Sequence, residues 1–361
     1  MTQSGHVTAL SPAVAALQRA MPISRLIDCG MAPEDADQLF AETAGGASWA
    51  RSAAHIAEHR FGQSQRDRTD PRSEARTIRQ AAAAWLFAQM AFNEDTERKR
   101  DLYRRYVETI TRYAELRIPA LERILVPYGA GHLVGWLALP AGGRADATVV
   151  VWGGLSGWGA AYLRLADALN QRGLACLLAE GPGQGEPRLN DRIFLDSDAV
   201  RGFARFVDAV CEDQRLGDRI GIQGNSFGGL FAGLLAARDP RVGACCVNGA
   251  PTNPSVPDFR TAREQIFSAV GLDDVRAAQS VLDTWRFDPL VQRLDCPLLL
   301  LHGARDPLAT FEQQRGFLEA AVPGLGTLRE WEDGEHTVYN HADQRDAFSA
   351  DWFASHLVSP S

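Results

Sequence analysis

The sequence lacks any apolar stretch long enough to cross a membrane. Its longest run of small apolar side chains covers residues 81–92, whereas a transmembrane helix needs about 20 apolar residues in a row. The amino terminus also lacks a basic segment followed by an apolar one, which is the pattern of an export signal. We therefore expect neither export nor a membrane anchor, and we predict a cytoplasmic protein.

Paired cysteines and an excess of basic residues are also missing. The six cysteines lie mostly in apolar runs and form no Cys-x-x-Cys pair, so we expect reduced core residues instead of disulfides or zinc ligands. The net charge is −8 and no basic stripe is present, which argues against nucleic acid or an anionic membrane as the partner. The expected partner is a small-molecule substrate.

The amino-terminal third of the chain has a helical pattern. From residue 11 to about residue 117, apolar side chains recur every three to four positions, which predicts four or five helices. Ser73 and Asp95 are the expected N-caps of the last two, and the polar residues 62–72 predict an exposed loop. Because 361 residues exceed the usual size of one core, we predict a helical region over residues 1–117 and a second domain over residues 118–361.

The period of the apolar pattern changes to two near residue 121. Residues 121–127 and 132–139 predict an antiparallel hairpin. Short apolar runs then alternate with helical segments, and these runs begin at residues 147, 174, 219, 243 and 297. Such alternation is typical of an α/β fold, a mostly parallel sheet with helices on both faces.

One motif of the helical region matches a zinc-binding pattern. His55, Glu58 and His59 form His-x-x-Glu-His, which binds zinc in one class of metalloproteases. The sequence indicates no distant third zinc ligand. A histidine pair on a solvated helix face is also much commoner than a zinc site with this pattern. We expect no metal and no cofactor.

The central motif of the second domain is Gly-x-Ser-x-Gly around Ser226, from Gly224 to Gly228. It follows a predicted strand and precedes a helical pattern, which is the setting of a nucleophile elbow. Glycines suit both flanking positions because the sharp turn leaves no room for side chains. The same pentapeptide also occurs in ordinary turns, so the motif alone makes Ser226 a candidate nucleophile and no more.

Two more polar residues follow predicted strands. Asp306 comes after the apolar run 297–302, and His336 after residues 326–331. Carboxyl ends of parallel strands meet at one edge of a sheet, and the chain order Ser, Asp, His is that of α/β-hydrolases. Each residue alone could be structural, as a helix cap or an exposed loop residue. Together they predict that His336 activates Ser226 and that Asp306 orients His336; alternative acids are Asp288, Asp333 and Glu335.

A glycine-rich loop follows the strand predicted at residues 147–152. Its position is that of the loop which supplies one oxyanion-hole amide in α/β-hydrolases, the other coming from the residue after the nucleophile. We predict Leu155 and Phe227 as these donors, and we expect Gly154, Ser156 and Trp158 to contact the substrate. A nucleotide site is not expected, because the spacing is not Gly-x-Gly-x-x-Gly and no P-loop lysine is present.

Together with the run from Glu180 to Glu186, Glu-Gly-Pro-Gly-Gln-Gly-Glu, these motifs resemble the α/β-hydrolase superfamily. The similarity is to the group typified by 2,6-dihydroxypseudooxynicotine hydrolase and to the FrsA-like serine hydrolases, and it covers residues 121–357. It implies an α/β-hydrolase fold with an N-terminal all-helical cap that contributes to a homodimer. It also implies cleavage of an activated C–C bond or an ester through an acyl-Ser226 intermediate.

One departure from that group bears on the substrate. Its pyridine-hydrolysing members carry an acidic residue directly after Gly-Gly-Leu, where this chain has Ser156. A neutral aromatic or polyketide-like substrate, such as a 1,3-diketone, is therefore expected.

Two other functions are compatible with the same residues. In an acyltransferase or cyclase, a substrate hydroxyl or amine takes the acyl group instead of water, and the triad is unchanged. A non-catalytic binding protein on a hydrolase scaffold is less expected, because such proteins usually lose a member of the triad.

Overall fold

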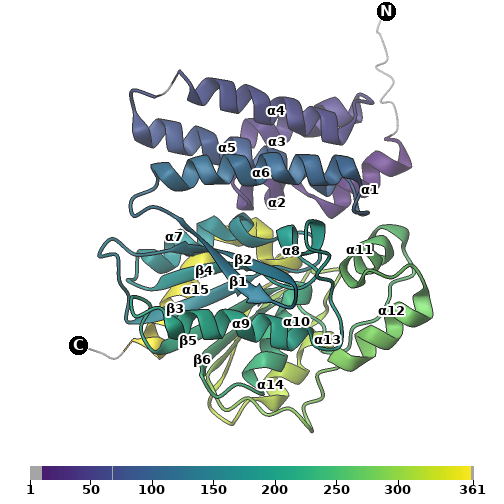
Figure 1. Ribbon diagram of the computed structural model, residues 1–361. Coiled ribbons are helices and arrows are strands. Elements are labelled where there is room, and N and C mark those ends of the chain that lie inside the picture. Colours follow the sequence, from purple (N-terminus) through teal and green to yellow (C-terminus); the bar gives the residue numbers. More distant parts are fainter. Residues whose placement is uncertain (1–9, 67, 359–361) are drawn as a thin grey trace, which may run out of the picture.

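The computed structural model describes residues 10–66 and 68–358 and consists of a helical block stacked on an α/β unit (Figure 1). The expected α/β fold with an N-terminal helical region is confirmed. No helix of the described residues is both long and apolar enough to span a bilayer.

Six helices of the described residues form the helical block, where four or five were predicted. The additional elements are short helices that begin beside prolines, whose fixed φ suits the first helical turn. The helices are α1 (Pro12–Ala20), α2 (Ile23–Asp28), α3 (Pro33–Ala44), α4 (Trp49–Ser64), α5 (Pro71–Met90) and α6 (Glu97–Leu116).

Both predicted N-caps of this block are wrong. Helix α5 starts at Pro71, and Asp70 is its cap, accepting a hydrogen bond from the Arg72 amide at 3.1 Å. Thr96 caps α6 through the Lys99 amide at 3.2 Å. Asp95 instead forms an ion pair with Arg188 of the α/β unit at 3.0 Å.

The sheet has eight strands in the order β1-β2-β4-β3-β5-β6-β7-β8. The predicted hairpin of β1 and β2 is present, and β2 also pairs antiparallel with β4, while the remaining pairs are parallel. The strands are β1 (Glu122–Tyr128), β2 (Gly131–Ala138), β3 (Ala147–Trp152), β4 (Ala175–Glu180), β5 (Arg219–Asn225), β6 (Val242–Asn248), β7 (Leu298–Gly303) and β8 (Gly326–Trp331).

Helices cover both faces of the sheet, and one face is shared with the helical block (Figure 1). The helices of the α/β unit are α7 (Leu163–Asn170), α8 (Gly185–Leu189), α9 (Ala199–Glu212), α10 (Phe227–Ala236), α11 (Arg260–Val270), α12 (Val275–Leu282), α13 (Phe311–Gln314), α14 (Gly316–Ala320) and α15 (Ala342–Leu357). Short 3-10 turns lie at Gly159–Tyr162, Asp283–Trp285 and His336–His341.

A single apolar core runs from the helical block into one face of the sheet. Val149 and Val151 of β3 pack in the same cluster as Trp85 of α5 and Tyr106 of α6. Their neighbours Val150 and Trp152 point to the other face, toward α9 and α10, as the two-residue period of a strand requires. The helical block therefore completes the core of the α/β unit.

Candidate active site

Ser226 lies in a sharp turn between β5 and α10. Its φ of 54° and ψ of −137° are sparsely populated for a residue with a side chain and cost about 1–3 kcal/mol. A Cβ atom on Gly224 would overlap the Gly228 carbonyl, and one on Gly228 would overlap the Gly153 carbonyl. Both glycines of the motif are thus required by the turn that lifts Ser226 above the sheet.

The three residues of the predicted triad come together at the carboxyl edge of the sheet. His336 Nε2 lies 2.8 Å from Ser226 Oγ, and His336 Nδ1 lies 2.8 Å from Asp306 Oδ2. The other Asp306 oxygen accepts hydrogen bonds from the Leu308 and Ala309 amides at 2.8 and 3.1 Å. This arrangement leaves Nδ1 to donate to the carboxylate and Nε2 to accept from the serine hydroxyl.

The loop after His336 is held in an unusual conformation. Thr337 and Val338 have φ values of 50° and 60°, a left-handed conformation that is strained for β-branched residues. Asn248, at the end of β6, donates to the Thr337 carbonyl at 3.2 Å. Arg345 of α15 donates to the same oxygen at 3.0 Å. These bonds keep the imidazole of His336 directed at Ser226.

The Gly153–Leu155 loop lies against the turn of Ser226. A Cβ on Gly154 would be only 2.8 Å from Ser226 Cβ and 3.0 Å from the Phe227 amide nitrogen. The Gly154 carbonyl accepts hydrogen bonds from Gln184 and Trp158, both at 3.2 Å. Because C=O and N–H point in opposite directions across a trans peptide, these bonds direct the Leu155 amide away from Gln184 and Trp158.

The second predicted donor is at a helix start. Phe227 is the first residue of α10, and the first amides of a helix have no partner within it. The Leu155 and Phe227 amides therefore lie on the two segments that meet at Ser226. Their donation to a reaction intermediate stays a prediction.

Gln184, which had no predicted role, is buried between the two loops. Its Nε2 donates to the Gly153 carbonyl at 2.5 Å as well as to Gly154, and its Oε1 accepts from the Gly181 amide at 3.0 Å. The only signal was its place in the Gly-Pro-Gly-Gln-Gly run. A side-chain amide can both donate and accept, which this position uses.

Two predicted substrate contacts face the helical block. The Ser156 hydroxyl accepts from Arg25 of α2 at 3.0 Å. Trp158 is fully buried, and its ring packs edge-on against Tyr103 of α6. Whether either residue touches substrate stays a prediction, and the contribution of Arg25 was not foreseen.

A buried carboxyl group joins α6 to the end of β4. Glu180 accepts from the Tyr103 hydroxyl at 2.6 Å and from the Glu186 amide at 2.9 Å. Burial and, to a smaller extent, the neighbouring Glu186 charge raise the pKa of Glu180 to about 7, although both hydrogen bonds act in the opposite direction. This group titrates near neutral pH in the folded protein.

The alternative acids have other partners. Asp333 contacts His341 at 2.7 Å, Glu335 accepts from Ser24 of α2, and Asp288 accepts from the Leu290 amide at 2.9 Å. The acid on Nδ1 of His336 is therefore Asp306, as predicted from chain order.

Four other histidines of the described residues lie outside this constellation. His302 is buried and contacts Gln314 at 2.9 Å, while His132 is exposed. His55 and His59 are exposed on α4. The described part of the chain contains no group of three or more side chains suited to hold a metal ion.

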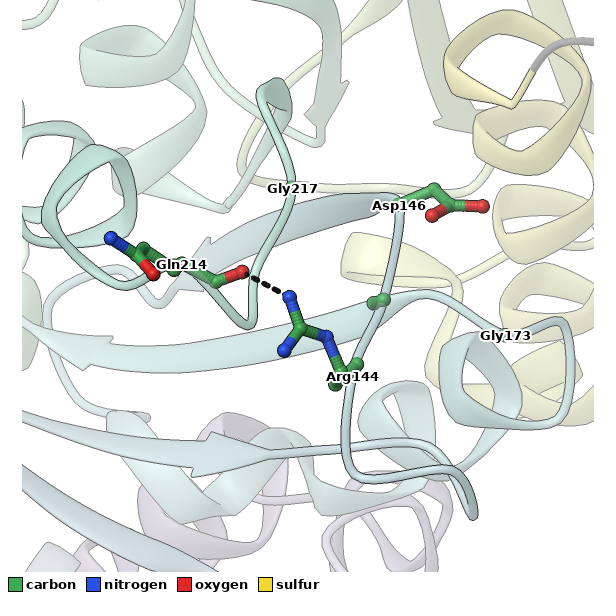
Figure 2. Close-up of a pocket in the computed structure, with 6 residues that line it drawn as sticks. Arg144, Asp146, Gly173, Gln214 and Gly217 are labelled. Atoms are coloured by element: carbon green, nitrogen blue, oxygen red, sulfur yellow. Dashed lines mark hydrogen bonds between the residues drawn. The ribbon is translucent and has the colours of Figure 1, made fainter.

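A separate polar recess lies at the opposite edge of the sheet (Figure 2). Arg144 donates to the Gln214 carbonyl across it at 3.0 Å. Its other lining residues include Asp146, Gly173 and Gly217, which precede the amino ends of β3, β4 and β5. It therefore has no part in the chemistry at the carboxyl edge.

Comparison with known proteins gives a consistent picture. A family model described as serine aminopeptidase, S33, matches residues 143–270. The 2,6-dihydropseudooxynicotine hydrolase of Paenarthrobacter nicotinovorans is 26% identical over 296 residues, which are 80% of this chain and 78% of that protein. The hydrolase acrC of Aspergillus aculeatus is 35% identical over 144 residues, 34% of this chain and 33% of that protein.

The similarity extends to the three-dimensional structure. The crystal structure of 2,6-dihydroxy-pseudo-oxynicotine hydrolase matches with a TM-score of 0.82 at 23% identity, over 93% of this chain and 95% of that chain. This coverage includes helical block and sheet alike, and it confirms the resemblance found in the sequence. The chain is thus similar in sequence to α/β-hydrolases and has their fold.

Proposed function

We propose that the protein is a serine hydrolase that cleaves the bond between an acyl group and an electron-poor carbon, with esters as further substrates. The observation that carries this proposal is the hydrogen-bonded series Asp306, His336 and Ser226, with both contacts at 2.8 Å. A neutral serine is a weak nucleophile, so His336 Nε2 takes its proton during attack. Asp306 keeps the required tautomer and stabilises the imidazolium that forms.

Attack of Ser226 on the substrate carbonyl places a negative charge on oxygen. The amides of Leu155 and Phe227 are the proposed donors to that oxygen, because they come from the two segments that meet beside Ser226. Loss of one such donor typically costs about 10²–10³ in kcat. The bonds from Gln184 to the Gly153–Leu155 loop support a fixed donor position.

Collapse of the intermediate then breaks the bond to carbon. The departing carbon leaves with the bonding electron pair, so an adjacent carbonyl or aromatic ring must stabilise it. His336, now an imidazolium, protonates that carbon, and water afterwards hydrolyses the acyl-serine with the histidine again acting as base. Similarity to a 2,6-dihydropseudooxynicotine hydrolase supports hydrolysis over binding alone.

The helical block acts as a cap in this proposal. Arg25 and Ser24 of α2 contact the loops of Ser156 and His336, so the helical block helps to form the site and to exclude water. Homodimer formation and a cytoplasmic location stay predictions of the sequence.

A paired assay tests the bond that is cut. A 1,3-diketone with one aromatic arm is compared with a p-nitrophenyl ester of equal size in deuterated water. The proposal expects cleavage of both, with solvent deuterium in the released carbon of the diketone. Ester turnover with no diketone cleavage, across several arm sizes, would leave an esterase. Transfer of the acyl group to an added alcohol in preference to water would identify an acyltransferase.

A further inference from the structure

Lys99, the only lysine of the chain, is buried between the cap and the loop that follows the proposed oxyanion donor. It is 4% exposed. Its ammonium lies 5.4 Å from the ring centre of Trp158, and the guanidinium of Arg188 lies 4.7 Å from the same ring. Lysine is almost never buried without a partner, so this position calls for an explanation.

The protein itself neutralises only one of these two cations. Asp95 lies 3.0 Å from Arg188. Lys99 donates to the Phe92 carbonyl at 2.7 Å, and no carboxylate of the described residues is within 4.0 Å of it. An ammonium has three N–H groups, so two of them lack a partner in the described part of the chain. The buried Nε of Arg188 likewise has no hydrogen-bond acceptor there.

These donors border a small recess that includes part of the loop after β3. Its walls come from the cap, from the loop after β3, and from α8 and α11. The lining residues are Met90, Phe92, Asn93, Lys99, Leu155, Ser156, Arg188 and Gln265. Leu155 and Ser156 line the recess. The residue before them, Gly154, lies against Ser226.

We propose that Lys99, together with Arg188, binds an anionic oxygen of the substrate, either a carboxylate or an ionised enol, beside the acyl group that Ser226 attacks. An anion at this position pairs with the charge of Lys99 and accepts hydrogen bonds from the free N–H groups. A neutral substrate group would leave these buried donors unsatisfied. The position of this subsite relative to the bond that is cut rests on the proposed function. This proposal differs from the neutral substrate expected from the sequence, and the experiments below decide between the two.

The protonation of Lys99 is linked to this binding. Burial lowers the pKa of Lys99 well below its usual value, repulsion from Arg188 lowers it further, and Asp95 raises it. A bound anion favours the ammonium form. Binding of an acidic ligand should therefore take up a proton from the buffer.

The first test compares two esters of equal chain length, the mono-p-nitrophenyl ester of adipic acid and p-nitrophenyl hexanoate. We expect the ratio of their kcat/KM values to favour the acid in the wild type and to fall about tenfold or more in Lys99→Met. Lys99→Arg should retain part of the preference. Arg105→Met is the matched control, because Arg105 lies on the same helix over the ring of Trp85, 5.2 Å away, and should keep the wild-type ratio.

The second arm distinguishes the two kinds of anion. It compares 2-acetylcyclohexane-1,3-dione, an acidic enol, with the much less acidic 2-acetylcyclohexanone. A preference for the dione that depends on Lys99 identifies an ionised enol, and a preference confined to the adipate ester identifies a carboxylate. The proposal would be overturned if Lys99→Met lowered kcat/KM equally for acidic and neutral substrates. It would also be overturned if the wild type showed no preference for the acidic substrate.

A binding measurement separates this proposal from the proposed function. Calorimetry with adipate and with the dione uses the Ser226→Ala protein, which needs no turnover, in two buffers of different ionisation enthalpy. We expect binding that is accompanied by proton uptake. Both the binding and the proton uptake should be lost when Lys99→Met is combined with Ser226→Ala. This result would support the subsite even if no ester or diketone were hydrolysed. Absence of binding, or binding unaffected by Lys99→Met, would refute it while leaving the triad intact.

Discussion

Asp28 of the cap and Arg345 of the α/β unit form a buried bidentate ion pair, with both oxygen–nitrogen distances at 2.9 Å. The same guanidinium donates to the Thr337 carbonyl at 3.0 Å, one residue beyond His336. Helix α2 is therefore connected through one side chain to the loop that carries the proposed general base. Docking of the cap and placement of His336 depend on the same contact.

The first prediction follows from this ion pair. Asp28→Asn should lower the free energy of unfolding by about 3 kcal/mol, because it leaves the buried Arg345 with only one carboxylate, that of Asp346. It should also lower kcat. Urea denaturation provides the measurement. Asp295→Asn is the control, since its pair with Arg293 is exposed and should change stability by less than about 1 kcal/mol; equal effects would contradict the connection.

A second prediction concerns the triad. Ser226→Ala should reduce kcat about 10⁴-fold or more with an unchanged unfolding midpoint, because it removes one half-exposed hydroxyl and no core packing. His336→Ala should be similarly severe, and Asp306→Asn somewhat less so. The double variant of Ser226 and His336 should be no worse than either single one, since triad residues act as a unit. If Ser226→Ala kept the wild-type rate, the assignment of Ser226 as the nucleophile would be wrong.

Much of the fold could be predicted because it depends on repeated local patterns. Strands β3, β4 and β7 are buried at every position, so each is apolar in the sequence apart from one polar residue, Thr148, Glu180 and His302 respectively. The proximity of Ser226, Asp306 and His336 could be anticipated too, because chain order and strand ends place them at one edge, while their catalytic roles stay predictions. By contrast, Ser73 has a suitable side chain for an N-cap, but Pro71 starts the helix earlier.

The contacts between cap and α/β unit could not be predicted in the same way. Arg25 meets Ser156 across 131 positions and Asp28 meets Arg345 across 317. A single polar residue in an apolar face has no periodic signal, and its partner depends on how two complete units pack. Lys99 and Gln184 belong to the same class, which explains why sequence indicated the nucleophile but not the residues that surround it.

The third prediction concerns pH. The pKa of Glu180 is about 7 in the folded protein and about 4.3 in an unfolded chain. The folded state thus binds more protons between these values, and the Glu180 contribution to stability is full below pH 4.3 and is lost as pH rises through 7. From the two pKa values the loss amounts to about 4 kcal/mol.

Glu180→Gln should remove this part of the pH dependence. Urea denaturation at intervals from pH 4.5 to 8 provides the measurement. The unfolding free energy of the variant minus that of the wild type should increase as pH rises. Glu332→Gln, at an exposed position, should show no such change. A constant difference across the range would mean that Glu180 does not titrate there.

The last prediction concerns Gln184, which we regard as the residue that positions the oxyanion donors. Gln184→Met removes the bonds to the Gly153 and Gly154 carbonyls and to the Gly181 amide, so the Leu155 amide loses its fixed direction. We expect kcat to fall about 10²-fold, comparable to the loss of one donor, with a smaller change in KM. A trifluoromethyl ketone inhibitor, which forms an oxyanion on Ser226, should lose affinity in proportion to kcat/KM.

Gln89→Met is the matched control for this variant. Gln89 of α5 is equally buried, but neither atom of its side-chain amide has a hydrogen-bond partner among the described residues. The same chemical change should therefore leave kcat unaltered and stability unchanged or higher, because an unsatisfied buried amide is removed. If Gln184→Met lost stability but bound the inhibitor as tightly as the wild type, Gln184 would support the loop without directing the amide of Leu155.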